Sequence, residues 1–203
     1  MKLYHSPASP YVRKVMVQAQ ETGLLDKIEV VPVSTTPMAP DANVAAANPV
    51  KKIPALVTDD GMTLFDSPVI CEYLDSLSGG AKMFPEGKAR WEALRLQAAA
   101  DGMLDAALLV VYESRFREEA MRNKAWTDAQ LAKIAGALDA FEATADSFGD
   151  RVDIGTISVG CGLGYVDFRL GHLNWRDGRP KLAAWYEAFS ARPSMQATKP
   201  PAA

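Results

Sequence analysis

The chain has 203 residues, of which 48% are hydrophobic and 23% charged, and it carries a formal net charge of −3. This length suits one large domain or two small ones of a soluble globular protein, and the weakly acidic balance disfavours nucleic acid or an anionic membrane as the main partner. Because no apolar run would span a bilayer, no secretory signal precedes the first predicted strand, and the two cysteines fit neither a metal site nor a disulfide pattern, we expect a cytoplasmic protein without a metal.

A short apolar strand over residues 2–5 precedes an amphipathic helix that ends at Gly23. Ser9 is a good N-cap for this helix and Pro10 a good first helical residue. We therefore expect the Ser9 hydroxyl at a helix N-terminus, where backbone N–H groups and the helix dipole favour an anion. A glutaredoxin has two cysteines where this chain has Ser9 and Val12. A two-cysteine redox cycle is thus excluded, and the site is expected to hold the thiolate of another molecule.

The rest of the first half of the chain alternates between strand and helix patterns. The predicted elements are a second strand, a loop with a helical turn and a β-hairpin, over residues 28–33, 36–48 and 55–65. Ser67 is expected to cap the next helix, with Pro68 as its first residue. The strand–helix–strand unit predicts a parallel strand pair. The order β-α-β, then β-β-α, predicts a thioredoxin-like domain over residues 1–77.

The second half of the chain is predicted to be helical after a linker over residues 78–87. Its predicted helices are one over residues 88–116, one with a capping box at Thr127 and Gln130, one capped by Asp153, and one that contains Leu182 and ends before Arg192. The helix after Asp153 is apolar nearly all round, so its glycines are expected where neighbouring helices approach closely. These patterns predict an all-helical domain over residues 88–203.

The Ile53-Pro54 bond is a second feature with chemical meaning. In a thioredoxin-like domain the proline just before the third strand lies beside the helix cap, so we expect this X-Pro bond to be cis. The backbone N–H and C=O of Ile53 would then face outward and pair with a bound peptide, as an added strand does.

Asp66 and Ser67 form the third feature, at the start of the second helix. Unpaired helix N–H groups there would bind a carboxylate, and Asp66 would bind an ammonium group. Taken alone, this pair is more often simply the start of a helix. Combined with Ser9 and the Ile53-Pro54 bond, it indicates a ligand with a thiol, a peptide link and a zwitterionic end. That ligand is glutathione, and Lys52 is expected near its glycine carboxylate.

Over essentially its whole length the chain resembles the cytosolic glutathione S-transferases, of the bacterial type with serine at the N-terminal helix cap. The segments that carry the resemblance are residues 9–14, 48–56, 66–67 and 164–169. The resemblance implies glutathione as co-substrate with no further cofactor, a small hydrophobic electrophile as the other substrate, and a homodimer. The family often has Glu at Asp66 and Gly at Lys51. It also caps its buried helix with Ser or Thr followed by Asp, the reverse of Asp153 and Thr156, so a weaker reciprocal bond is expected.

The mechanism expected from this site is stabilisation of the glutathione thiolate by a hydrogen bond from Ser9. The hydroxyls of Ser6 and Tyr11 are alternatives for this contact. The candidates for the electrophile pocket are Tyr11, Tyr112, Arg115 and Phe116. The last three also fit simple packing between the domains. By family analogy alone, Asp101 would reach the glutathione amino group across a dimer.

Two further classes of function stay open from the sequence. A glutathione-dependent isomerase, dehalogenase or peroxidase on the same fold would differ only in the electrophile pocket. A non-catalytic glutathione-binding regulatory protein would keep the fold without the chemistry. Thiol–disulfide exchange is disfavoured, because Cys71 and Cys161 lie outside the loop that precedes the first helix.

Overall fold

The computed structural model describes residues 1–80 and 82–201. The chain forms two compact units, Met1–Arg90 with Pro193–Pro201, and Trp91–Arg192. Over the described ranges, every helix is too short or too polar to cross a membrane.

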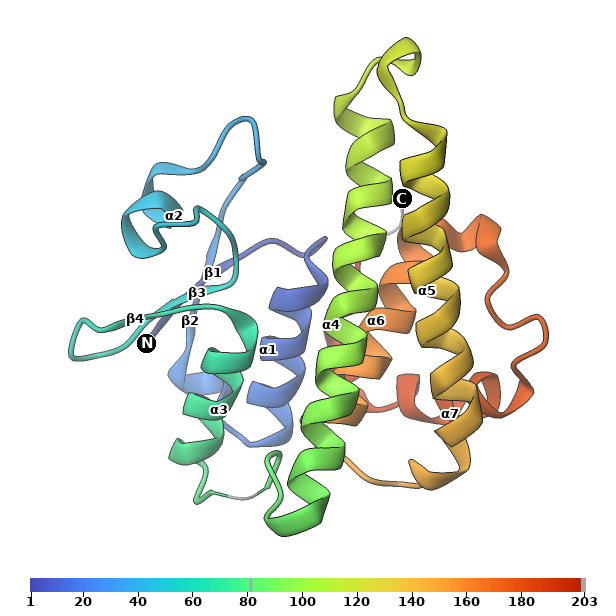
Figure 1. Ribbon diagram of the computed structural model, residues 1–203. Coiled ribbons are helices and arrows are strands. Elements are labelled where there is room, and N and C mark those ends of the chain that lie inside the picture. The colour runs from blue at the N-terminus through green and yellow to red at the C-terminus, as the bar shows by residue number, and fades with distance from the viewer. Residues whose placement is uncertain (81, 202–203) are drawn as a thin grey trace. The chain divides into compact units, whose positions relative to one another are not determined.

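The first unit is built on a four-stranded sheet with the order β2-β1-β3-β4 (Figure 1). Its elements are β1 (Lys2–His5), α1 (Pro10–Glu21), β2 (Glu29–Pro32), α2 (Ala42–Ala47), β3 (Ala55–Val57), β4 (Thr63–Leu64) and α3 (Ser67–Leu77), with a 3₁₀ turn at Leu25–Lys27. β1 and β2 are parallel, whereas β3 is antiparallel to both β1 and β4. Helices α1 and α3 pack together on one side of the sheet, and α2 lies against β3 on the other. The predicted thioredoxin-like arrangement, with its parallel pair and its hairpin, is confirmed.

The core of this unit joins the sheet to α1 and α3. Its side chains with no exposed surface include Leu3, Val12, Val15, Leu56, Ile70 and Leu74. Burying a side chain of this kind contributes about 1.5–3 kcal/mol relative to leaving it exposed. This packing fixes the orientation of α1, and with it the place of the helix N-terminus.

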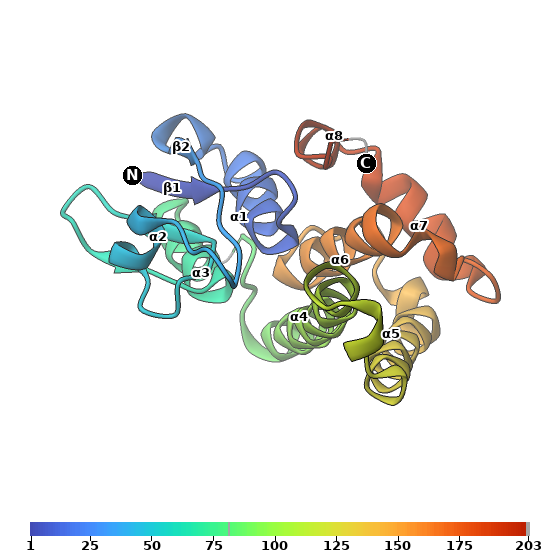
Figure 2. The same ribbon diagram turned by 90° about the horizontal axis from the view of Figure 1, so that it is seen from above.

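The second unit is helical. It contains most of α4 (Gly87–Phe116) together with α5 (Lys124–Thr144), α6 (Ile154–Leu170) and α7 (Pro180–Ser190), and 3₁₀ turns at Glu119–Met121, Ala145–Ser147 and Gly171–Leu173. Seen along the helices, α6 lies among α4, α5 and α7 (Figure 2). Every residue of α6 from Ile154 to Val166 is buried. The predicted central, apolar helix is confirmed.

The N-terminus of α6 carries a complete capping box. Oδ1 of Asp153 accepts from the backbone N–H of Thr156 at 2.9 Å, and Oγ1 of Thr156 accepts from the N–H of Asp153 at 3.0 Å. Both lengths are ordinary for N–H···O bonds. The order of Asp and Thr, reversed relative to the family pattern, therefore still satisfies both donors, and no lengthening of the reciprocal bond is seen.

Two predicted helix starts are wrong. Helix α5 begins at Lys124 rather than after Thr127, because the side chain of Asn123 already accepts from Trp126 N at 3.1 Å. Ser67 does not cap α3 but is its first residue, and Asp66 holds the cap position with an extended backbone. In the first case a capping bond from Asn123, four positions earlier, explains the shift; in the second the Asp66 side chain makes no capping bond, and the shift is a single residue.

One helix was missed altogether. Helix α8 (Pro193–Ala197) belongs to the first unit and packs on α1. The guanidinium of Arg13, only 6% exposed, donates to the carbonyl of Met195 at 2.9 Å. Ser194 donates to the carboxylate of Glu21 at 2.5 Å. These partners lie far apart in sequence, so the local pattern indicated only the end of the preceding helix.

Glycines allow α6 to approach α4 closely, as predicted. A Cβ atom at Gly155 would lie 2.7 Å from the carbonyl oxygen of Ala93 and 2.9 Å from Cβ of Leu96. At Gly162 it would lie 2.7 Å from Cε of Met103. The first contact involves backbone, so no side-chain rotation relieves it.

Gly155→Ala is expected to lower the free energy of unfolding by about 1–3 kcal/mol, because two helix backbones must separate. Gly102→Ala is the matched control on α4, since a Cβ atom there has no neighbour within 4 Å. The control should gain about 0.5–1 kcal/mol from the higher helix propensity of alanine. Urea unfolding measures both, and equal stability of the two variants would contradict the close approach.

Candidate functional site

Three loops of the first unit meet at one end of its sheet. β3 lies between β1 and β4 and runs antiparallel to both, so the end of β1, the start of β3 and the end of β4 share one edge. Ser9 follows β1, Ile53 and Pro54 precede β3, and Asp66 and Ser67 follow β4. The structure thus gathers at one edge the segments from which glutathione binding was predicted.

Ser9 is the N-cap of α1, as predicted. Its backbone is extended, and its Oγ accepts from the N–H of Val12 at 3.3 Å. Because the oxygen acts as acceptor, the hydroxyl proton remains available to donate to a second partner. The first turn of α1 contains no acidic residue, so the positive end of the helix dipole is not offset locally. The local field therefore favours an anion beside Ser9.

The two alternative hydroxyls lie close by in sequence. Ser6 is in the turn between β1 and α1, where its carbonyl accepts from Ser9 N at 3.0 Å. Tyr11 is in the first turn of α1 and half-buried. His5 ends β1, and burial lowers its pKa, so the imidazole is neutral at pH 7 and adds no positive charge to this edge.

The Ile53-Pro54 bond is cis, as predicted. The loop before it is organised by Asn48, which is 1% exposed. Its side-chain amide donates to the carbonyl of Lys52 at 2.8 Å and accepts from Val50 N at 3.0 Å. Sequence reasoning did not assign this role to Asn48, although an Asn-Pro pair is a known turn signal. The Lys52 side chain is exposed.

Lys51 has a left-handed backbone, with φ of 55°. This region favours glycine, because a Cβ atom there crowds the following carbonyl. Where the family often has glycine, this chain therefore has a lysine in a left-handed conformation that suits glycine better.

Lys51→Gly is expected to leave the free energy of unfolding unchanged or higher, because relief of the left-handed strain of about 1 kcal/mol offsets the added chain entropy. Lys52→Gly, one position later and without a positive φ, should lose about 0.5–1 kcal/mol. Thermal and urea unfolding compare the two. An equal loss in both variants would contradict the strain at Lys51.

Asp66 and Ser67 lie at the N-terminus of the 11-residue helix α3. Ser67 is 1% exposed, and the Asp66 carboxylate makes no capping bond to the helix. Over residues 1–80 and 82–201, neither side chain has a hydrogen bond or an ion pair. Their polar atoms are therefore available to a ligand. The Phe65-Asp66 bond is also cis, which the sequence did not indicate.

The remaining pocket candidates lie on α4, in the second unit. The rings of Tyr112 and Phe116 meet edge to face with centroids 5.1 Å apart, and the Arg115 guanidinium lies 5.8 Å from the Phe116 centroid. Burial raises the pKa of Tyr112, and Arg115 opposes that shift. Asp101 is half-exposed on the same helix. Tyr112, Arg115 and Phe116 thus form one aromatic and basic group near the end of α4.

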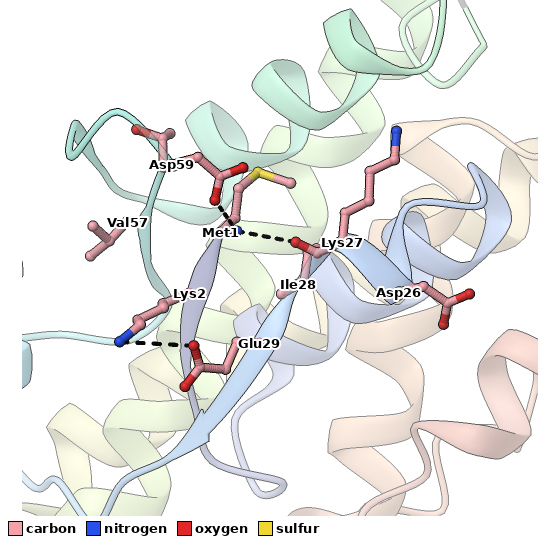
Figure 3. A pocket seen from close by; sticks show the side chains of 9 residues that line it. Met1, Lys2, Asp26, Lys27, Ile28, Glu29, Val57 and Asp59 are labelled. Carbon is pink, nitrogen blue, oxygen red and sulfur yellow. Dashed lines mark hydrogen bonds and ion pairs between the residues drawn. The ribbon is translucent and has the colours of Figure 1, made fainter.

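The opposite edge of the same sheet carries a hollow of about 510 Å³ (Figure 3). It is lined by residues 1, 2, 26–29 and 57–59. The ammonium group of Met1 lies 2.6 Å from Oδ1 of Asp59, and Lys2 lies 3.8 Å from Glu29. None of the predicted site residues lines this hollow.

No metal site accompanies the candidate residues. Across the part of the chain that the structure describes, no three His, Cys, Asp or Glu side chains come together to hold a metal ion. Cys71 and Cys161 are buried, and within the described residues neither takes part in a disulfide.

Known families match both halves of the chain. The glutathione S-transferase N-terminal domain matches residues 8–77, and the C-terminal domain of the same family matches residues 124–188. The curated Escherichia coli K12 protein "Uncharacterized GST-like protein YibF" is 34% identical, and the match covers all of both chains. The chain belongs to the glutathione S-transferase family.

Two solved structures of a glutathione transferase family member from Pseudomonas fluorescens Pf-5 are similar throughout. One, with bound glutathione, is 48% identical over 98% of each chain, with a TM-score of 0.96. The other, with bound S-(propanoic acid)-glutathione, is 46% identical over 99% of this chain and 100% of that one, with a TM-score of 0.91. The predicted family and its two-part fold are confirmed for this glutathione S-transferase family member.

Proposed function

We propose that this family member is a glutathione transferase, in which Ser9 stabilises the glutathione thiolate for attack on a small hydrophobic electrophile. The observation that carries the proposal is a hydroxyl that caps a 12-residue helix while its own proton stays free to donate. A free thiol with a pKa of about 8.5 is mostly protonated at neutral pH. A donated hydrogen bond and a helix N-terminus both favour the thiolate and lower that pKa.

The rest of glutathione would bind to the neighbouring loops. The backbone of Ile53, before Pro54, would pair with the cysteinyl unit as an added strand does, and Lys52 would lie near the glycine carboxylate. Asp66 would bind the ammonium group of the γ-glutamyl end, and Ser67 with the first N–H groups of α3 its carboxylate. The unpaired polar atoms of Asp66 and Ser67 support this assignment.

The proposed reaction forms a bond between the glutathione sulfur and an electrophilic carbon. The thiol proton leaves to solvent on binding, and the leaving group departs with the electron pair of its bond to carbon. Ser9 donates a hydrogen bond throughout and forms no covalent bond, because within the described residues its hydroxyl bonds to the N–H of Val12 and to no base that would make it a nucleophile. The electrophile would contact Tyr11, Tyr112, Arg115 and Phe116.

One relative favours conjugation over peroxidase chemistry. The Pseudomonas structure with S-(propanoic acid)-glutathione holds a glutathione whose sulfur bears a carbon substituent. A compound of that type is the product of conjugation, whereas a peroxidase makes a disulfide. Isomerase and dehalogenase reactions also pass through a bond between sulfur and carbon, so they stay alternatives, and a purely regulatory protein would bind glutathione without turnover.

The cytoplasmic location stays a prediction.

We also propose that the protein forms a homodimer. The first unit exposes several apolar side chains at 45–62% of their surface: Val50, Met62, Val69 and Leu77. Covering such residues is the usual role of a protein interface. Sedimentation equilibrium at micromolar concentration should give twice the chain mass, and a monomer would contradict this part of the proposal.

Ser9→Ala is expected to lower kcat/KM for glutathione conjugation about 10- to 100-fold, since a hydrogen bond to a charged group contributes about 1.5–3 kcal/mol. The thiol pKa of bound glutathione, read from thiolate absorbance, should rise towards that of the free thiol. Ser6→Ala is the matched control, three residues earlier in the same turn, and should change neither value.

The pair of variants decides between the two serines. Loss of activity in Ser6→Ala with an active Ser9→Ala would transfer the role to Ser6. Full activity of both would remove the role from the two serines and transfer it to Tyr11, with the transferase function still standing. Glutathione binding with no turnover of any electrophile by the unaltered protein would overturn the proposed function.

Asp66→Asn is expected to weaken glutathione binding about tenfold, because the ammonium group loses a charge-assisted partner. Asp26→Asn removes an exposed carboxylate from the opposite edge of the sheet and should leave the Kd unchanged. Isothermal titration calorimetry measures both. Equal Kd values for the two variants would remove Asp66 from the proposed site.

A further inference from the structure

Two tyrosine–arginine pairs lie near the ends of α4 and α6. Tyr112 and Arg115 are three residues apart on α4, and Tyr165 and Arg169 are four apart on α6. Residues at these spacings are neighbours on one helix face. Each helix therefore presents a hydroxyl and a guanidinium together.

The contacts between the helices bring the two pairs to the same level. Gly155 contacts Ala93, and seven residues further along α6 Gly162 contacts Met103, so both helices advance in the same direction. The figures show α4 and α6 side by side (Figures 1 and 2). Extending this match places Tyr165 and the residues after it beside the last turns of α4.

The electrostatics of Tyr165 agree with this placement. Burial raises the pKa of Tyr165 to about 12, with Tyr112 adding to the shift and Arg169 and Arg115 opposing it. Two of these influences come from α4, so the two pairs lie close enough to act on one another.

Neither guanidinium of these pairs is neutralised by a carboxylate. Over residues 1–80 and 82–201, Arg115 and Arg169 have no ion pair and lie instead over aromatic rings, Arg169 at 3.8 Å from the Phe168 centroid. Arg117 and Arg176 are paired, with Glu113 at 2.8 Å and Asp167 at 2.6 Å. Acidic residues are therefore available near both helix ends, and a shortage of them does not explain why Arg115 and Arg169 have no ion pair.

The helix dipole explains only part of this arrangement. Arg115 and Arg169 each lie in the last turn of a helix, where a cation is stabilised. The dipole does not explain why each helix also carries a tyrosine beside the arginine, or why the two helix ends lie close together. Two guanidinium groups and two phenol hydroxyls together supply hydrogen-bond donors and positive charge, and none of the four groups is negatively charged. Such a set suits a carboxylate ligand.

We propose that Tyr112, Arg115, Tyr165 and Arg169 bind a carboxylate of the second substrate. The inference rests on the proposed transferase function and narrows its substrate class to apolar electrophiles that carry a carboxylate. The arginines supply charge and paired hydrogen bonds, the tyrosines donate, and the rings of Phe116 and Phe168 offer apolar surface to the rest of the molecule.

The test compares two glutathione conjugates, S-(propanoic acid)-glutathione and S-propylglutathione, whose three-carbon substituent on sulfur carries a carboxylate in the first and none in the second. Isothermal titration calorimetry on the full chain should give at least tenfold tighter binding of the carboxylate. Arg115→Gln and Arg169→Gln should each reduce that preference about tenfold and leave S-propylglutathione binding unchanged. Arg95→Gln, at an exposed position of α4, is the matched control and should keep the preference.

The outcomes separate the two proposals. Equal affinity of the unaltered protein for both conjugates, with glutathione still bound, overturns the carboxylate site and leaves the transferase function standing. Failure to bind glutathione or either conjugate overturns both. A preference that survives in the arginine variants while their melting temperature falls shows that these residues only stabilise helix ends, and overturns the inference. If Arg169→Gln does not fold, the exposed Arg115 decides.

Discussion

The antiparallel pairing of β3 with both of its neighbours is the constraint on which the candidate site depends. Each pairing turns the chain back, so loops that are tens of residues apart in sequence end at one edge of a small sheet. Two helices, α1 and α3, begin at that edge, and their unpaired N–H groups face the same region. A ligand with two negatively charged groups would thus meet two helix N-termini there.

Ser9 joins the stability of the fold to the chemistry at this edge. Its oxygen accepts from the N–H of Val12, which leaves its proton available to a ligand. A substitution at Ser9 therefore acts on helix capping and on the ligand together, and the two effects separate only through a comparison of stability with thiol pKa. Asp66 differs, because its carboxylate occupies a cap position without making the capping bond. Its charge is thus available to another partner.

Local patterns were sufficient to predict most of the first unit and the central helix of the second. The Ser9-Pro10 start, the hairpin and the central apolar helix each depend on residues within a few positions of one another. Features that depend on distant partners were missed: α8 is held by α1, and Asn48 acts through a loop whose shape follows from the fold. The start of α5 was misplaced because Asn123 and Thr127 are both competent caps, and the sequence does not rank them. The convergence of Tyr165 with Tyr112 required the glycine contacts between two helices.

The return of the chain to its first unit has a consequence for the order of events during synthesis. The carbonyl of Met195 accepts a hydrogen bond from the buried guanidinium of Arg13, and Met195 is synthesised 182 residues after Arg13. At about 5–20 residues per second, the ribosome takes roughly 10–40 s to cover that distance. During that interval α1 exists with a charged group that has no internal acceptor from α8 and must stay hydrated. The unit that begins first is therefore among the last to be completed, and no single cut in the chain releases it whole.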